Sequence, residues 1–254
     1  MLGIFLLVKS PDDYILAAFL QACTPLIAGI FSIVWLRKHY TGLFKLPSMG
    51  EIINSYKEGW SIFVSSLAVN LYTATNVVVL GMLTNNVIVG YYSAADKLIT
   101  CVRRGIYAVS DAIYPFISKM MRDDILKGLQ FIKKQLFLYL IVGLVGCTSL
   151  FFFSDTIVRL LFGADYDLTV DVLRILSFVP LAVAISTVFG EETMLPLNMN
   201  SAYSRTLVLG AFFSLISIFP LCYLWGAKGV AITMLLTEFL IMSIMGGLLR
   251  KQLF

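Results

Sequence analysis

The sequence predicts an all-α membrane protein, and three observations lead to this fold class. Of the 254 residues, 59% are hydrophobic and 13% are charged, and the mean hydropathy of +0.89 lies far from the values of soluble domains. The apolar residues gather in seven long runs, most of which contain no Asp, Glu, Lys or Arg. Because about 20 apolar residues are enough for a helix to cross roughly 30 Å of hydrocarbon, we expect a polytopic protein with seven transmembrane helices.

The seven helices are expected where the apolar runs lie. In chain order the runs are residues 14–35, 59–83, 87–117, 136–153, 170–190, 206–225 and 230–249. The polar residues Thr84, Asn85 and Asn86 form a short turn before the third run. A hydrophilic link follows the third run and is expected to be a loop in water, because it contains Lys119, Arg122, Asp123, Asp124, Lys127, Lys133 and Lys134. Strands fit the runs less well, since the strands of membrane β-barrels alternate in polarity over about ten residues.

The basic residues indicate membrane topology and not a nucleic-acid partner. The formal charge is +4, but most of the cations fall between the apolar runs, as the positive-inside rule describes. Threading the seven helices in order places one set of cations on one side, namely Arg37, Lys38, Lys45, Lys57, Lys119, Arg122, Lys127, Lys133, Lys134, Arg205, Arg250 and Lys251. The other side receives only Lys9, Arg159 and Lys228. We therefore expect a cytoplasmic C-terminus.

The sequence offers no sign of a cofactor, a metal site or a catalytic site. The cysteines lie in separate apolar runs without a close pair, at Cys23, Cys101, Cys147 and Cys222. His39 is the single histidine, so neither a disulfide framework nor a zinc site is expected. No phosphate-binding loop and no constellation of nucleophile and base is found.

The first eight residues are apolar but too short to span a membrane. Met1 to Val8 would form about 12 Å of helix, and the segment shows neither a basic leader nor a cleavage site of a signal peptide. Two interpretations stay open. The chain is an N-terminally truncated transporter, which we favour, or a complete seven-helix protein with a short external tail.

The third run, 87–117, differs from the others because its polar residues are organised along one helix face. Steps of three and four residues connect Gly90, Ser93, Lys97, Thr100, Arg104, Tyr107, Asp111 and Tyr114, with Asp96 and Arg103 at the flanks. The opposite face contains Ala95, Ile99, Val102, Ile106, Val109, Ile113 and Phe116. This pattern indicates a helix with apolar neighbours on one side and a wet, charged space on the other.

The five charges of this helix require partners, because each costs roughly 2.5 to 3.5 kcal/mol at the centre of a membrane. Spacing of seven residues brings Asp96 near Arg103, but three cations against two anions leave one positive charge over. An anionic group of a substrate in a cavity would neutralise it. The alternative is that the charges form struts between helices or reach the headgroups. Among other candidates, Arg174 is expected near an interface and Glu191 and Glu192 at a cytoplasmic end.

Several segments resemble the O-antigen and polysaccharide flippases of the multidrug/oligosaccharidyl-lipid/polysaccharide exporter superfamily. They are EGWSIFVSSL at 58–67 with Tyr72, Thr75 and Asn76, VIVGYYSAADK at 87–97, LFGADY at 161–166, VLRIL at 172–176, and GAKGVA at 226–231 with Glu238. The resemblance implies two six-helix lobes of which this chain retains the second lobe plus one helix. It therefore implies a remnant of the first lobe at 1–35, a cytoplasmic linker at 36–58 and the second lobe at 59–254.

The resemblance also implies a function and its residues. Such a flippase moves an undecaprenyl-pyrophosphate-linked oligosaccharide, such as an O-antigen repeat unit of lipopolysaccharide, across the bacterial inner membrane. Its partners would be this substrate, membrane lipids and other polysaccharide assembly proteins. In this hypothesis Lys97, Arg103 and Arg104 hold the pyrophosphate or an acidic sugar, and Tyr107 and Tyr114 stack on sugars. The ion-pairing or coupling residues are Asp96, Asp111 and Glu238.

Three other functions stay open. A cation-coupled antiporter of small molecules would show an excess of acidic residues in its cavity. A membrane polymerase or ligase of glycans would need a catalytic site, and the largest external connection, 154–169, has no His, Cys or Lys. The third alternative is an inactive remnant.

Overall fold

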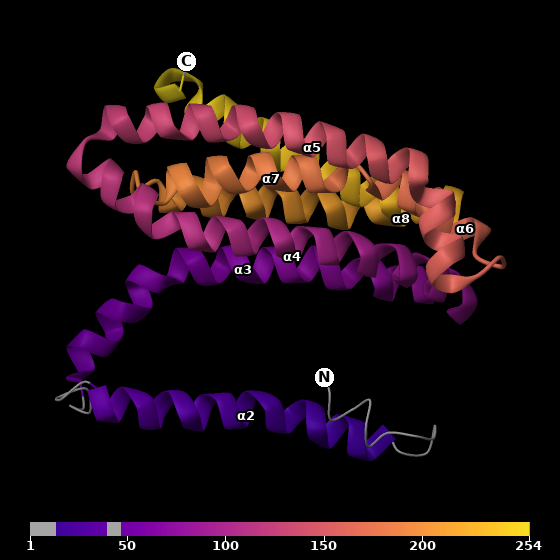
Figure 1. Cartoon of the computed structure of the whole chain (residues 1–254), viewed down its shortest axis with the longest axis horizontal. Helices are drawn as coiled ribbons and strands as arrows, with labels where there is room; N and C mark the ends of the chain where they lie inside the picture. Colours follow the sequence, from indigo (N-terminus) through magenta and orange to yellow (C-terminus); the bar gives the residue numbers. More distant parts are fainter. Residues whose placement is uncertain (1–13, 40–46, 254) are drawn as a thin grey trace. The chain divides into compact units, whose positions relative to one another are not determined.

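The fold class is confirmed by a computed structural model of the protein, which describes residues 14–39 and 47–253 (Figure 1). These residues form helices, and no strand occurs among them. Within residues 14–39 and 47–253, four helical segments are long and apolar enough to cross a membrane, at Gly59–Leu83, Ile125–Phe162, Asp167–Met194 and Asn200–Arg250. The protein is therefore an all-helical, polytopic membrane protein.

The chain divides into two compact units, Met1–Ser55 and Tyr56–Phe254. The first contains helix α2 (Tyr14–His39) and the beginning of helix α3 (Met49–Leu83). A capping box starts α3, in which Glu51 Oε2 accepts from Ser48 N at 2.7 Å and Ser48 Oγ accepts from Glu51 N at 3.3 Å. The hydrogen bonds that Ser48 N and Ser48 Oγ donate to the Glu51 carboxylate hold the pKa of this carboxyl below its usual value.

Helix α4 (Asn86–Asp123) and helix α5 (Ile125–Phe162) are both 38 residues long. The predicted polar turn caps α4, because Asn85 Oδ1 accepts from Ile88 N at 3.0 Å. The hydrophilic link after the third run was expected to be a loop, and this expectation is wrong, because Asp124 alone separates the two helices. Lys and Arg are good helix formers, so a polar sequence can continue a helix beyond its apolar part.

The fifth predicted helix is interrupted. It consists of α6 (Asp167–Leu176), α7 (Val179–Phe189) and a π-helix, η2 (Gly190–Met194). The break between α6 and α7 comes directly before Pro180, which lies in the first turn of α7. Proline is tolerated in the first turn of a helix but lacks the N–H that a continuous helix would need.

Helix α8 (Asn200–Leu253) contains the sixth and seventh predicted helices as two antiparallel arms. The backbone leaves the helical conformation at Gly226, where φ is 54°, a value that favours glycine. In a straight helix, residues 210 and 241 would lie about 46 Å apart, yet the Ile241 side chain lies against Gly210. The chain therefore reverses at Gly226, and we refer to the first arm, 200–225, and the second arm, 227–253.

Helices α4, α5 and α7 and the arms of α8 run side by side in the second unit (Figure 1). Their buried apolar residues form two clusters, one around Ile99, Leu173 and Met234 and the other around Ile117, Val188 and Ile241. Along α4 and the second arm of α8, buried polar residues occupy the positions between these clusters. They are Arg103 and Ser110 on α4 and Thr237 and Glu238 on α8.

Candidate functional site

Arg103 is buried on the inner face of α4, although it flanks the polar stripe in the sequence. It follows Tyr92 and Ile99 and precedes Ser110 along a row of buried residues at helical spacing. Only 8% of Arg103 is exposed. A guanidinium at such a position requires a partner from another helix.

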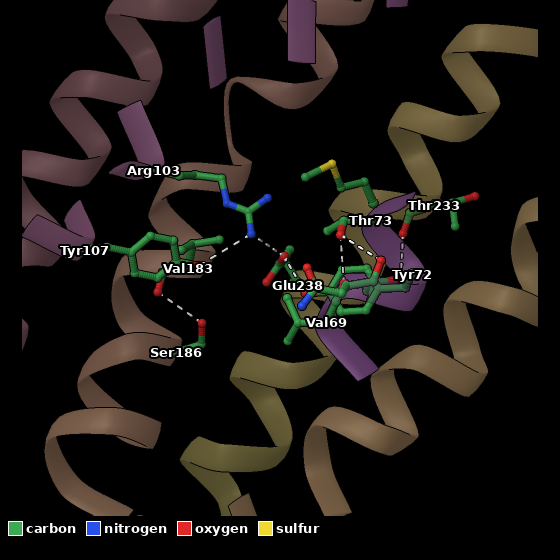
Figure 2. A network of polar contacts seen from close by, with 12 residues as sticks. Val69, Tyr72, Thr73, Arg103, Tyr107, Val183, Ser186, Thr233 and Glu238 are labelled. Atoms are coloured by element: carbon green, nitrogen blue, oxygen red, sulfur yellow. Dashed lines mark hydrogen bonds and ion pairs between the residues drawn. The ribbon is translucent and has the colours of Figure 1, made fainter. Parts of the chain in front are cut away.

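Glu238, on the second arm of α8, is the partner of Arg103 (Figure 2). Arg103 Nη2 lies 3.5 Å from Glu238 Oε1 and donates to the Tyr107 hydroxyl at 3.5 Å. The Tyr72 hydroxyl of α3 donates to the same Glu238 oxygen at 3.0 Å. We call these four residues the arginine cluster. It joins α3, α4 and α8, and the two tyrosines lie on opposite sides of the pair.

The sequence spacing pointed to Asp96 as the neighbour of Arg103, but Arg103 forms its ion pair with Glu238. Asp96 lies on α4 itself, whereas Glu238 comes from a helix 135 positions away in the chain, which spacing within one helix cannot detect. Among the described residues, Asp96 forms no ion pair. It is partly buried.

The other charges of α4 are exposed. Lys97, Arg104 and Asp111 form no ion pair with any residue that the structure describes. All three belong to the polar stripe predicted from the sequence. The stripe therefore contains two cations and one anion whose charges are not compensated by direct contacts in the described part of the chain.

A first polar cavity, of about 440 Å³, lies along the beginning of the stripe. We call it the lysine cavity. Gly90, Ser93 and Lys97 line it from α4, and Phe162 and Tyr166 line it from the end of α5 and the segment after it. The Tyr166 ring stacks on Phe162, at 5.4 Å between centroids. A cation beside aromatic rings suits an anionic or hydroxyl-rich ligand.

A second polar cavity, of about 550 Å³, lies along the end of the stripe. Tyr107, Asp111 and Tyr114 line it from α4, and Glu191 and Tyr203 contribute from η2 and the first arm of α8. We call it the tyrosine cavity. An inner chamber of about 50 Å³ shares Tyr107, Glu191 and Tyr203 with it and also touches Tyr72 and Glu238. The cavity thus approaches the arginine cluster.

A third cavity, of about 350 Å³, differs in chemistry. It lies between α4, α5 and α7 and is lined almost entirely by apolar or small residues, such as Val102, Gly105 and Gly146. The apolar face of α4 predicted from the sequence contributes Val102, Ile106 and Val109 to it. The polar and apolar faces of α4 therefore border different spaces.

The sequence did not predict the environment of Glu192, which is fully buried in the π-helix. Its Oε1 accepts from Ser110 Oγ at 2.7 Å and its Oε2 accepts from Gln135 Nε2 at 2.6 Å. The expectation of a helix-end position for Glu191 and Glu192 did not distinguish the two. Glu191 lines the tyrosine cavity, and Glu192 packs between α4 and α5. π-Helices are frequent at functional sites, but no pattern in the sequence predicts the π-helix η2.

In the described part of the chain, no three His, Cys, Asp or Glu residues gather in a way that could hold a metal ion. The candidate site consists of the polar face of α4, two polar cavities and the arginine cluster. Such an arrangement can bind a polar or charged molecule.

Comparisons with known proteins confirm the resemblance found in the sequence. Residues 1–121 match the sequence model of a family described as "Polysaccharide biosynthesis protein". Two curated relatives are each named "Putative O-antigen transporter". The protein from Shigella dysenteriae is 32% identical over 244 residues, which cover 95% of this chain and 60% of the relative. The protein from Escherichia coli (strain K12) is 31% identical over 249 residues, which cover 98% of this chain and 60% of the relative.

The chain thus spans about 60% of the length of the curated relatives that it matches. No solved structure gives a significant match.

Proposed function

We propose, from this confirmed resemblance to polysaccharide transporters, that the chain corresponds to the C-terminal portion of a flippase. This flippase moves a lipid-linked oligosaccharide repeat unit, such as that of an O-antigen, across the bacterial inner membrane. The C-terminus would lie in the cytoplasm, as the distribution of basic residues suggests. The proposed substrate carries an undecaprenyl pyrophosphate, and no covalent step is required of the protein.

The observation that carries the proposal is the exposed polar face of α4. Lys97 and Arg104 form no ion pair within the described residues, and polar cavities adjoin the face before and after them. A pyrophosphate is strongly anionic, and charge-assisted hydrogen bonds from Lys and Arg are among the strongest in proteins. The transfer of a glycan into hydrocarbon is unfavourable, because its hydroxyl groups would lose their hydrogen bonds there.

The proposed roles differ among Glu238 and the five charged residues of the stretch 87–117 of α4. We assign the pyrophosphate to Lys97 and Arg104. Arg103 is occupied by Glu238 and acts as a positioning residue that holds α4 against α8. Asp96 would orient the neighbouring cations, and Asp111 would contribute to a cavity wall or to ion coupling. Tyr107 and Tyr114 line the tyrosine cavity, where they can stack on sugars.

Replacement of Arg104 by alanine in the chromosomal gene tests the proposal. Loss of one charge-assisted hydrogen bond, about 1.5–3 kcal/mol, should reduce surface polysaccharide roughly 10- to 150-fold, with unchanged protein abundance in the membrane. Arg122→Ala is a matched control, because Arg122 is exposed at the end of the same helix and donates to its own backbone at Ser118. Normal export by the Arg104→Ala protein would refute the substrate role.

A second candidate function, a cation-coupled antiporter of small molecules, is favoured by one observation. The tyrosine cavity is lined by Asp111 and Glu191, and none of the lining residues in the described chain is a cation. Such a wall suits a cationic guest. Cells that express the gene should then extrude a cationic dye such as ethidium, and the Asp111→Asn variant should lose this extrusion. The amount of surface polysaccharide should not change in this variant.

A further inference from the structure

The tyrosine cavity combines three kinds of groups that recognise carbohydrate. Tyr107, Tyr114 and Tyr203 offer aromatic faces, Asp111 and Glu191 offer carboxylate acceptors, and Ser65 and Asn70 of α3 offer groups that both donate and accept. Sugars present apolar C–H faces and many hydroxyl donors, which match rings and carboxylates respectively. With a volume of about 550 Å³, the cavity falls within the range of small-molecule sites.

The charge of the wall limits what the cavity can accept. Asp111 and Glu191 form no ion pair within the described residues, so their carboxyl groups are available to a guest. A carboxylate on the guest would meet two acidic side chains, and no basic side chain among the described residues that line the cavity would compensate it, which costs binding energy. A hydroxyl or an ammonium group would instead donate to them.

The two cavities of α4 are therefore opposite in charge. Among the described residues, Lys97 is the one charged residue that lines the lysine cavity, whereas Asp111 and Glu191 line the tyrosine cavity. About 10 to 17 residues of helix separate Lys97 from the stretch 107–114, which corresponds to roughly 15–26 Å along the axis. An anionic group and a sugar of the same lipid-linked molecule can be separated by such a distance.

We infer that the tyrosine cavity binds a neutral or amino-bearing sugar of the transported glycan and rejects an acidic sugar such as a uronic acid. The inference rests on the proposed function and refines its substrate class. It departs from the initial hypothesis that the cations of α4 hold an acidic sugar, because the cavity with the sugar-stacking tyrosines contains carboxylates.

Binding of simple glycosides to the purified full chain tests this inference. The chain is placed in nanodiscs without glycolipid, since maltoside detergents would compete, and saturation-transfer NMR is recorded with methyl glucoside, methyl glucosaminide and methyl glucuronide. We expect the first two to bind and the glucuronide to bind at least about tenfold more weakly. In the double variant Asp111→Asn with Glu191→Gln, this ratio should fall towards one.

The control is Asp123→Asn, which removes an exposed carboxylate from the same helix outside the cavity and should preserve the discrimination. Size-exclusion chromatography shows whether each variant is folded. Equal binding of the glucuronide to the unmodified chain would overturn the inference, as would binding of none of the three glycosides. If export of polysaccharide depends on Arg104 but the chain does not discriminate between the glycosides, the inference is wrong and the proposed function is still supported.

Discussion

Arg103 and Arg104 are neighbours in the sequence but occupy opposite environments. Arg103 is 8% exposed and paired with Glu238, whereas Arg104 is exposed and forms no ion pair in the described part of the protein. One residue corresponds to a rotation of 100° about a helix axis, which is enough to move a side chain from the interior to the polar face. The same residue type therefore joins helices at one position and is available to a ligand at the next.

This difference separates the two interpretations of the charged helix. The contact of Arg103 with Glu238 fits a strut between helices, whereas a substrate-facing role of Lys97 and Arg104 stays a prediction. A charge with a protein partner contributes to stability, while a charge without one can contribute to binding. Substitutions should separate the two roles by their effects on unfolding and on transport.

The largest effect is expected from Glu238→Leu. This substitution leaves the Arg103 guanidinium buried without its carboxylate, and removal of one partner from a buried ion pair typically costs about 3–5 kcal/mol. The free energy of unfolding of the purified protein, measured by denaturant titration in nanodiscs or mild detergent, should fall by this amount. An unchanged stability would show that the pair is not buried in the native protein.

The double variant Arg103→Met with Glu238→Leu distinguishes the electrostatic contribution of the ion pair from the contribution of the volume that the two side chains fill. Buried ion pairs can be replaced by apolar residues of similar size at little cost, so the double variant should recover most of the stability lost in Glu238→Leu. A further loss on adding Arg103→Met would contradict this explanation.

A smaller effect is expected from Gln135→Leu. Gln135 donates to the buried Glu192 at 2.6 Å, and loss of a hydrogen bond to a carboxyl group costs about 1.5–3 kcal/mol if the group is charged. The free energy of unfolding should decrease accordingly, while Gln130→Leu, an exposed residue on the same helix, serves as the control. If the two variants had equal stability, the Gln135–Glu192 contact would have no energetic role.

Arg104→Lys should have a milder effect on export than Arg104→Ala. Lysine keeps the charge but loses the planar fork that binds phosphate oxygens bidentately. Loss of about one hydrogen bond, roughly 1 kcal/mol, should reduce surface polysaccharide about fivefold, with little change in stability. If Lys were as defective as Ala at this position, the geometry of the guanidinium would matter more than its charge.

The sequence predicted those features that depend on local pattern. The apolar runs 59–83, 136–153, 170–190, 206–225 and 230–249 fall within the described segments that can cross a membrane, because each run is a property of consecutive residues. Asn85 marks the start of α4 because its side chain caps the following turn. The polar stripe also follows from helical spacing. Its residues Tyr107, Asp111 and Tyr114 do line one cavity.

Other features depend on tertiary contacts and could not be predicted. Helices α5, α6, α7 and η2 and the first arm of α8 lie between Arg103 and Glu238 in the chain, so the pair exists only after the bundle has assembled. Glu191 and Glu192 are adjacent, and the π-helix decides which of them faces the tyrosine cavity. The charges of the polar link after the third run predict a loop in water, but Lys and Arg are also good helix formers, and the link is helical except at Asp124.

The smallest effect concerns Asp124, the residue that separates α4 from α5. Its carboxylate accepts from Leu126 N and Lys127 N at 3.0 and 3.2 Å, and these hydrogen bonds, first of all that from Lys127, hold its pKa below the usual 3.8. A carboxyl group whose pKa is lower in the folded protein than in the unfolded chain stabilises the folded protein, and the full contribution is present when the pH is above the unfolded-state pKa. This contribution is lost as the pH falls through the folded-state pKa.

In Asp124→Asn the cap remains, because Asn is an N-cap as good as Asp, but the titrating group is gone. The melting temperature at pH 6 should therefore be nearly unchanged, and the decrease between pH 6 and pH 3 should be smaller than in the parent protein. Asp123→Asn, which removes the neighbouring carboxylate, should retain the parent's decrease. Identical pH profiles for the parent and Asp124→Asn would mean that this cap contributes nothing to acid sensitivity.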